Sequence, residues 1–536
     1  MKLKMFFALV FFTFFQIAIF PDEFQDSSSV DDSIQREFLV LMSRQRFNLN
    51  PHTATYSSEA QILDALYEGL YSYDPRTLDP IPALATNCKV SRDKKKLTFT
   101  IREGAHFSDG SEITASSVRN SWLLLLSTPN APYASLFDCI VGAADYRTGK
   151  ISEKDVGIIA RDSRTLVVTL LTPTAHFTKI ICHPAFCVRA FQDNVFSGAF
   201  VLSERSDEQI VLKKNEQYWD AENVHIPSIR IKTDDDISEN SWAFNTGKAD
   251  WIVSAFDASL LLNRSSVRLS TIFGTEYIFF RCDRPPFDRA DIRNALIAAV
   301  PWEELRKLSY VQASSLVYPL SGYPSVEGLT ETSEEDALEL MEAARKNAGI
   351  KKDEKIRLVM GILASSERQK RQFEILRDAW KKLGVELDVN ATNDSRYIEA
   401  IGEWDADLFV YSWIGDFADP IAFLELFRDG STLNQTAWKN DDFSSALLEA
   451  ASTTESDARY KILSEAEQIL LDDGVILPVS HQVSLHALNP LAVGGWFTNA
   501  LDIHPYKYLF LKHSSSEIPN VVQHSQVKTE ISCSLR

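Results

Sequence analysis

Cysteine and histidine are scarce in this chain, and their spacing excludes several kinds of site. The 536 residues contain six cysteines and ten histidines. Six cysteines are too few for a disulfide-stabilised scaffold. Because no C-x-x-C pair occurs and the histidines are scattered along the sequence, the usual zinc-binding patterns are missing as well. We therefore expect no metal site and no cofactor.

The motifs of the common enzyme classes are also missing. The sequence has no G-x-x-x-x-G-K-[ST] phosphate loop, no G-x-S-x-G elbow and no H-E-x-x-H helix. Runs of acids such as 234–236 and 472–473 read as solvated turns or helix ends, and nothing singles out a glycosidase pair among them. We expect no enzyme, and an exported hydrolase is the alternative from another class.

Basic residues are outnumbered by acidic ones. Lys and Arg total 55, Asp and Glu total 74, and the formal net charge is −19. This charge argues against nucleic acid or an anionic membrane as the main partner. The 45% hydrophobic content suffices for large cores, and the length corresponds to about three to four domains of roughly 150 residues.

Long hydrophobic runs are absent except at the N-terminus. Lys2 and Lys4 precede an apolar run, residues 5–20, which is typical of a secretory signal. An uncleaved anchor is the alternative, and a lipid anchor is disfavoured because the first cysteine is Cys88. We expect a signal or anchor at 1–21, a polar linker at 22–36 and a polar tail at 514–536. We expect a soluble mature protein in the periplasm.

Hydrophobic periodicity predicts a mixed α/β fold. The spacing predicts helices at 59–70, from a Thr114 cap to 126, and at 291–300, 334–347 and 367–383. Strands are expected at 96–102, 164–171, 209–213, 356–362, 385–389 and 406–413. Their alternation in the second half indicates a partly parallel sheet.

One constellation suits ligand binding. Trp413, Ile414, Gly415 and Asp416 directly follow a predicted strand, and Asp419 and Pro420 come shortly after. Loops at the carboxyl ends of strands often meet ligands in α/β sheets. A carboxylate beside an indole suits a ligand that carries an ammonium group next to apolar parts. The alternative is that Trp413 is a core residue and Asp416 a turn or capping residue.

At this loop the chain resembles a known family over residues 38–513. It is similar to the bacterial extracytoplasmic solute-binding proteins of oligopeptide and dipeptide ABC importers, and most similar to the oligopeptide binders. The motifs that carry the resemblance are 49–52 (LNPH), 66–70 (LYEGL), 97–110 (LTFTIREGAHFSDG), 131–135 (APYAS), 198–200 (GAF), 215–219 (NEQYW), 284–287 (RPPF) and 493–496 (VGGW).

The resemblance implies a two-lobed periplasmic-binding-protein fold that closes on ligand like a hinged trap, with an inserted third subdomain. Lobe 1 would comprise 37–67, 191–273 and 496–513, the insert 68–190, and lobe 2 274–495. The implied function is capture of oligopeptides and their delivery to ABC importer permease subunits in the inner membrane. We expect a monomer.

The resemblance also implies site residues. The ligand main chain would pair with Thr55, Tyr56 and Ser57, and Asp416 would hold the ligand amine. The other residues that it places at the ligand are Trp413, Ile414, Tyr133, His183 and Thr275. Simple packing is the alternative for Tyr133, and a satisfied loop residue is the alternative for His183.

The chain departs from the oligopeptide binders at the other end of the ligand. Positions aligned with basic groups for the ligand carboxylate read Gln369, Val410 and Ile401. An expected aromatic falls near Asp394 and an expected glutamate near Phe279. The cleft should therefore prefer longer peptides, capped peptides or amino-bearing ligands such as cell-wall peptides. The same fold could alternatively bind a peptidoglycan fragment, heme, a metal chelate or a saccharide.

Cys182 and Cys187 lie five residues apart on either side of His183. An exported protein permits a disulfide there, which would hold His183 at the cleft, and two buried thiols are the alternative. Cys533 is expected to be a lone thiol.

Overall fold

The computed structural model describes residues 36–393 and 401–512. The expected signal, most of the linker, Asp394, the polar tail and Cys533 lie outside these ranges. Within the described ranges, no helix combines the length and the apolar character needed to cross a membrane.

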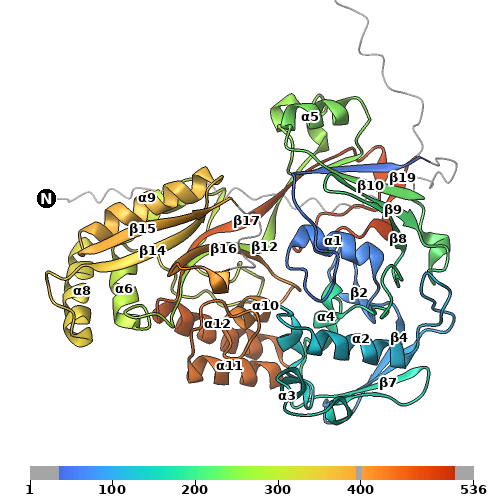
Figure 1. The fold of residues 1–536 in the computed structure, drawn as a ribbon, viewed down its shortest axis with the longest axis horizontal. Helices are drawn as coiled ribbons and strands as arrows, with labels where there is room; N and C mark the ends of the chain where they lie inside the picture. The colour runs from blue at the N-terminus through green and yellow to red at the C-terminus, as the bar shows by residue number, and fades with distance from the viewer. Residues whose placement is uncertain (1–35, 394–400, 513–536) are drawn as a thin grey trace, which may run out of the picture.

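One sheet runs through two parts of the molecule, from β15 to β8 (Figure 1). Its strand order is β15-β14-β16-β12-β17-β11-β1-β10-β9-β8, and β13 pairs with β17. Parallel pairs (β14 with β15 and β16, β1 with β10 and β11) and antiparallel pairs occur together, which confirms a partly parallel sheet. The strands are β1 Phe38–Met42, β8 Phe200–Arg205, β9 Gln209–Lys214, β10 Ser228–Thr233, β11 Trp251–Val253, β12 Val267–Phe280, β13 Val311–Gln312, β14 Ile356–Leu363, β15 Val385–Thr392, β16 Leu408–Ile414 and β17 Ile476–Leu488.

Two long antiparallel strands, β12 and β17, join the two halves of this sheet (Figure 1). At one end β12 borders β16, and at the other end β17 borders β11. The ladder between them shifts register between Thr271 and Thr275. A second shift lies between Glu276 and Tyr277. The two lobes are therefore connected by a continuous pair of strands that is irregular at two points.

Helices cover both faces of the half that contains β14 to β16. On one face the sheet buries Ile278, Leu358 and Val410 against α6, α8 and α9. On the other face it buries Phe409, Tyr411 and neighbouring side chains against α10 to α12. The helices of this half are α6 Ala290–Ala298, α7 Trp302–Arg306, α8 Glu334–Ala348, α9 Glu367–Lys381, α10 Ile421–Leu424, α11 Asp441–Ser452 and α12 Ser456–Asp472.

The other half has its own core beneath α1 (Ser57–Leu66), where Phe38, Ile62, Trp251 and Tyr506 are buried together. A smaller cluster lies under α5 (Ile237–Asn245). The short strands β18 (Val493–Gly494) and β19 (Phe510–Leu511) return the chain to this half.

The segment predicted as an insert forms separate small sheets. It contains a four-stranded sheet in the order β4-β5-β7-β6 and the pair β2-β3. Its apolar core is continuous with the one under α10 to α12. The elements are β2 Tyr71–Tyr73, β3 Pro80–Pro82, β4 Ala85–Val90, β5 Lys96–Ile101, β6 Ile158–Ala160, β7 Thr165–Thr169, α2 Ala115–Ser127, α3 Ala143–Arg147 and α4 Phe177–Ile180.

Most predicted helices and strands are present within a few residues of the expected bounds, and Thr114 caps α2 as predicted. The helix predicted at 59–70 ends earlier, at Leu66, because the chain is extended at Tyr67. Tyr67 belongs to the core beneath α1, whereas Leu70 belongs to the core of the insert. The chain thus passes from one core to the next here, near the predicted boundary at 67–68.

Cys182 and Cys187 are free, buried thiols. Cys182 lies in the core of the insert and Cys187 in the core beneath α1. Because the two side chains face different cores, the disulfide hypothesis is wrong in this structure, and the alternative of two thiols holds.

Position 198 requires glycine because the backbone there passes very close to the end of α1. A Cβ atom added at Gly198 would lie 2.5 Å from the carbonyl oxygen of Ala65 and 2.6 Å from the backbone nitrogen of Tyr67. We expect Gly198→Ala to lower the free energy of unfolding by about 1–3 kcal/mol, measured by urea denaturation. Gly402, where an added Cβ meets nothing within 4 Å, is the matched control. Equal stability of the Gly198→Ala and Gly402→Ala variants would contradict the close approach.

Candidate functional site

Asp416 lies just after the end of β16 and is surrounded by side chains of the insert. Its own side chain is buried. The Tyr133 hydroxyl donates a hydrogen bond to the carboxylate, and the Tyr73 hydroxyl donates to the Asp416 carbonyl oxygen at 2.5 Å. Nε2 of His183 lies 3.7 Å from Oδ1. The structure therefore brings together three residues that the sequence predicted, Asp416, Tyr133 and His183, and adds Tyr73.

His183 is held as a neutral imidazole. Its Nδ1 accepts a hydrogen bond from the Ala185 backbone N–H at 3.2 Å, so Nε2 carries the proton and points toward Asp416. Its ring lies against Tyr133, with 4.4 Å between the centroids. Burial lowers the pKa of His183 to about 3. Packing, rather than a disulfide, positions His183, and its ring brings no positive charge to Asp416.

The two aspartates of the loop differ in their partners. Asp419 accepts two hydrogen bonds of 2.8 Å from the Arg459 guanidinium, and Nζ of Lys179 lies 3.7 Å from it. Burial would raise the pKa of Asp419, but Arg459 outweighs that effect and the pKa lies below its usual value. Asp416 has no lysine or arginine partner within the described ranges, and burial raises its pKa well above the usual value.

Trp413 is both a core residue and a neighbour of Tyr133. Its ring centroid lies 6.3 Å from that of Tyr133, and its indole N–H donates to the Ala422 carbonyl oxygen at 3.0 Å. Only 5% of Trp413 is exposed. Ile414 is the half-buried last residue of β16.

Thr275 is a buried residue of β12. It lies inside the sheet, where β12 pairs with β16 at Trp413 and with β17 at His481. Its hydroxyl is 2.7 Å from the Leu316 carbonyl oxygen and 3.0 Å from Nδ1 of His481. Strands flank Thr275 on both sides, so its backbone groups pair within the sheet. Its place at the ligand stays a prediction.

The segment expected to pair with the ligand main chain precedes α1. Glu59, fully buried in the first turn of α1, accepts the backbone N–H groups of Thr55 at 3.0 Å and Tyr56 at 3.2 Å. These two amides are therefore not offered to a ligand strand in this conformation, whereas Ser57 is exposed.

The positions aligned with carboxylate-binding groups are structural. The Gln369 side chain accepts the Leu363 N–H at 2.7 Å. Val410, Ile401 and Phe279 are buried in apolar cores. None of them supplies a positive charge to a ligand.

A cavity of about 300 Å³ lies between the insert and helices α10 and α11. Its wall is mostly apolar, and it includes Phe417, the residue after Asp416. Six of the lining residues are Leu136, His176, Phe417, Ile421, Arg428 and Leu447. It lies where two parts of the molecule meet, as ligand cavities often do.

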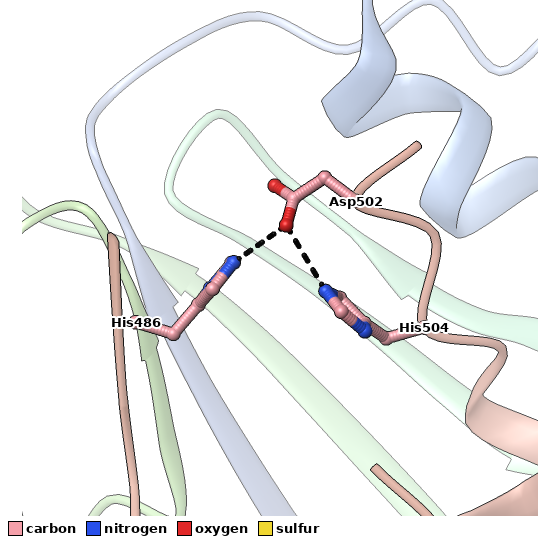
Figure 2. Close-up of side chains that lie close together, drawn as sticks. All are labelled: His486, Asp502 and His504. Atoms are coloured by element: carbon pink, nitrogen blue, oxygen red, sulfur yellow. Dashed lines mark hydrogen bonds and ion pairs between the residues drawn. The ribbon is translucent and has the colours of Figure 1, made fainter. Parts of the chain in front are cut away.

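One group of potential metal ligands occurs within the described ranges, His486, Asp502 and His504 (Figure 2). The sequence reasoning missed it because its members are far apart in the chain. However, the Trp251 indole N–H, which can only donate, lies 3.2 Å from Nδ1 of His486. Nε2 of His486 must then carry a proton, so its lone pair is not available to an ion.

Comparison with known proteins identifies the fold and family. The profile of the bacterial extracellular solute-binding proteins, family 5, matches residues 79–435. The chain belongs to this family. The predicted relationship to solute-binding proteins of oligopeptide and dipeptide importers is therefore confirmed, and with it the main functional expectation, a binding component of an ABC importer.

Individual relatives are similar over most of the chain. The dipeptide-binding protein DppE of Bacillus subtilis is 28% identical over 483 residues, which cover 84% of this chain and 87% of DppE. The oligopeptide-binding protein OppA of the same organism is 27% identical, covering 82% and 86%. The structure of the Escherichia coli murein tripeptide binding protein MppA has a TM-score of 0.79 at 22% identity and covers 90% of this chain and 100% of MppA. The two-lobed fold is thus confirmed.

The buried charge of Asp416 makes the stability of the ligand-free protein depend on pH. Burial raises the pKa of Asp416 in the folded state. The folded protein is therefore more stable at low pH, where this carboxyl group is protonated, and it loses that stability as pH rises through the folded-state pKa. Asp416→Asn should be more stable than the wild type at pH 7, by roughly 1–3 kcal/mol, and equal to it near pH 3. Calorimetric unfolding of ligand-stripped protein measures this difference. A constant difference between the two pH values would contradict it.

Proposed function

We propose that this protein captures peptides through their free α-ammonium group, which the Asp416 carboxylate receives. The observation that carries the proposal is the contrast between two buried aspartates three residues apart. Asp419 is neutralised by Arg459, whereas Asp416 has no lysine or arginine partner within the described ranges. A buried carboxylate is stable in its charged form when a cation joins it.

The neighbours of Asp416 suit an ammonium ligand. Tyr133 hydrogen-bonds to the carboxylate, and the Trp413 ring lies 6.3 Å from the Tyr133 ring. Aromatic faces such as these attract a cation. Neutral His183, whose Nε2 lies 3.7 Å from the carboxylate, brings no positive charge that would compete with the ligand ammonium group. The ammonium would form charge-assisted hydrogen bonds to Asp416 in a site shielded from water.

Binding requires the lobes to separate. Asp416 comes from lobe 2, and Tyr73, Tyr133 and His183 come from the insert, so the site is complete only when these parts meet. Lys179 of the insert donates to the Ala418 carbonyl oxygen at 3.0 Å, and this contact would form anew at each closure. The proposed lobes (37–67, 191–273 and 496–513; 68–190; 274–495) have one boundary within β12, at 273–274, and another just after β18, at 495–496. The hinge would lie at these two crossings.

The remaining parts of the proposal concern the setting. We infer that the chain acts outside the cytoplasm, as a monomer, and delivers ligand to permease subunits in the membrane. It acts by binding and release rather than by catalysis. The segment of Thr55, Tyr56 and Ser57 would form a wall of the site. Glu59 holds the backbone N–H groups of Thr55 and Tyr56, so these two groups would not pair with the ligand main chain in this conformation.

The test of the proposal is the effect of Asp416→Ala on peptide affinity. For tri-alanine, isothermal titration at pH 7.5 should show a loss of about 2 kcal/mol or more, because a buried charged hydrogen bond disappears. N-acetyl tri-alanine should bind the wild type and the variant with similar affinity, since it carries no ammonium group.

Asp419→Ala is not a suitable control, because it leaves Arg459 buried without its partner. Asp388, an exposed residue of β15, provides the matched variant Asp388→Ala, which should bind like the wild type. Unchanged affinity of folded Asp416→Ala for tri-alanine would remove Asp416 from the site. If no peptide binds the wild type, native mass spectrometry of protein purified without denaturation would identify heme, a chelate, a saccharide or a peptidoglycan fragment instead.

The carboxyl end of the ligand should contribute little. Because Gln369, Val410 and Ile401 supply no cation, tri-alanine and its C-terminal amide should differ in dissociation constant by less than about fivefold, or roughly 1 kcal/mol. Isothermal titration of both ligands measures the ratio. A strong preference for the free carboxylate would mean that another basic group takes over that task.

A further inference from the structure

The apolar cavity between the insert and helices α10 and α11 has a buried floor made by both parts. The insert contributes Leu136 and Ile180, and lobe 2 contributes Phe417, Ile421 and Leu447. Each of these five residues is at most 7% exposed. An apolar molecule in contact with them would be largely removed from water, which is favourable.

The cavity reaches solvent on one side. Two of its lining residues are exposed leucines, Leu171 of the insert at 52% and Leu448 of α11 at 62%. Exposed apolar side chains at the mouth and buried ones at the floor give a small apolar molecule a continuous path inward.

The size of the cavity selects small molecules. A cavity of about 150 Å³ lined by Leu, Ile and Phe binds benzene, and this one measures about 300 Å³. It therefore suits a molecule of about ten to fifteen non-hydrogen atoms. Over the described ranges, its lining does not include Asp416, Tyr133 or His183, so it is separate from the candidate ammonium site.

His176 supplies an unused hydrogen-bond donor to this cavity. The residue is 8% exposed, lines the cavity and stacks on Phe417. Its Nδ1 lies 3.4 Å from Nη2 of Arg459, and because a guanidinium can only donate, Nδ1 accepts and Nε2 of the neutral ring carries the proton. Burial lowers the pKa of His176 to about 4. Within the described ranges, Nε2 has no hydrogen-bond partner, and a ligand acceptor would provide one.

The charged side chains of the wall are paired with one another. Nε of Arg428 donates to Glu425 at 2.6 Å, and Nη2 of Arg147 donates to Asp138 at 2.8 Å. In the described part of the chain, the lining therefore offers no unpaired charge to a ligand. A charged molecule would lose its hydration there without gaining a counter-ion.

We propose that this cavity is a second binding site, for a small neutral molecule that has an apolar body and a hydrogen-bond acceptor held by His176. Because the two walls come from the insert and from lobe 2, such a molecule stabilises the arrangement in which Asp416 meets Tyr133 and His183. Only this effect on peptide affinity rests on the proposed function.

Binding is tested with 4-phenylbutan-2-one and two shape-matched analogues, the charged 3-phenylpropanoate and n-butylbenzene, which has no acceptor. Isothermal titration of the full chain at pH 7.5 should show saturable binding of the ketone, about tenfold or more tighter than that of the carboxylate. Absence of saturable ketone binding, or equal affinity for the carboxylate, would overturn the proposal.

The role of His176 is tested by His176→Phe, which keeps a ring against Phe417 and removes the N–H group. The variant should bind the ketone about fivefold more weakly, because one hydrogen bond is lost. Its affinity for n-butylbenzene should stay within about twofold of the wild type, since that ligand accepts no hydrogen bond. An equal loss for both ligands would mean that His176 only maintains the shape of the cavity.

The position of the ligand is tested by Cys139, a partly buried free thiol in the cavity wall. Ketone at about ten times its dissociation constant should slow modification of Cys139 by N-ethylmaleimide about tenfold, measured by mass spectrometry of the peptide. Cys88, a partly buried free thiol of β4 outside the lining, is the matched control and should react at an unchanged rate. Bound ketone without protection of Cys139 would place the ligand elsewhere and overturn the proposal.

The effect on lobe closure is tested by the affinity for tri-alanine. Saturating ketone should tighten tri-alanine binding about fivefold, and tri-alanine should tighten ketone binding by the same factor. Equal tri-alanine affinity with and without bound ketone would overturn this coupling. If tri-alanine does not bind the wild type, the proposed function fails, while the ketone titration and the protection of Cys139 still decide whether the cavity is a binding site.

Discussion

The ladder between β12 and β17 is the constraint on which the rest of the structure depends. It is the part of the sheet shared by both halves, and it breaks register between Thr271 and Thr275. Phe273 lies in that break, so its backbone groups bond to Gly415 and Ala500 instead of to β17. The irregularity thus joins the hinge strands to the loop of Asp416 and to the segment 496–504.

A buried carboxylate without a cation is the second organising feature. Asp416 sits among Tyr73, Tyr133 and His183, and none of them supplies a positive charge. Tyr133 donates to its carboxylate, Tyr73 donates to its backbone carbonyl, and His183 lies 3.7 Å away. Such a group is costly to ionise alone and favourable to ionise beside an ammonium group. Binding of a cationic ligand and closure of the lobes can therefore favour one another. The ligand neutralises the buried carboxylate, and the closed lobes shield the ion pair from water.

Local pattern predicted the elements well and their environment less well. The periods of apolar residues predicted most helices and strands, since these periods reflect burial of one face. The same pattern extended the first helix to Leu70, because it cannot tell that Tyr67 and Leu70 enter different cores. The pattern also did not show that β12 is paired on both sides at Thr275, because its partner strands are distant in sequence. Likewise, the spacing of Cys182 and Cys187 carries no information about which core each faces.

By itself the sequence determined the family, the α/β character and the position of Asp416, because ordered motifs and local periodicity are properties of neighbouring residues. Tertiary structure decided which aspartate is neutralised, since Arg459 lies forty residues after Asp419. It also decided that Glu59 holds the amides of Thr55 and Tyr56 and that His486, Asp502 and His504 meet. The physical reason is that the charge state of a buried group depends on its partners in space, and long-range chain folding alone brings those partners together.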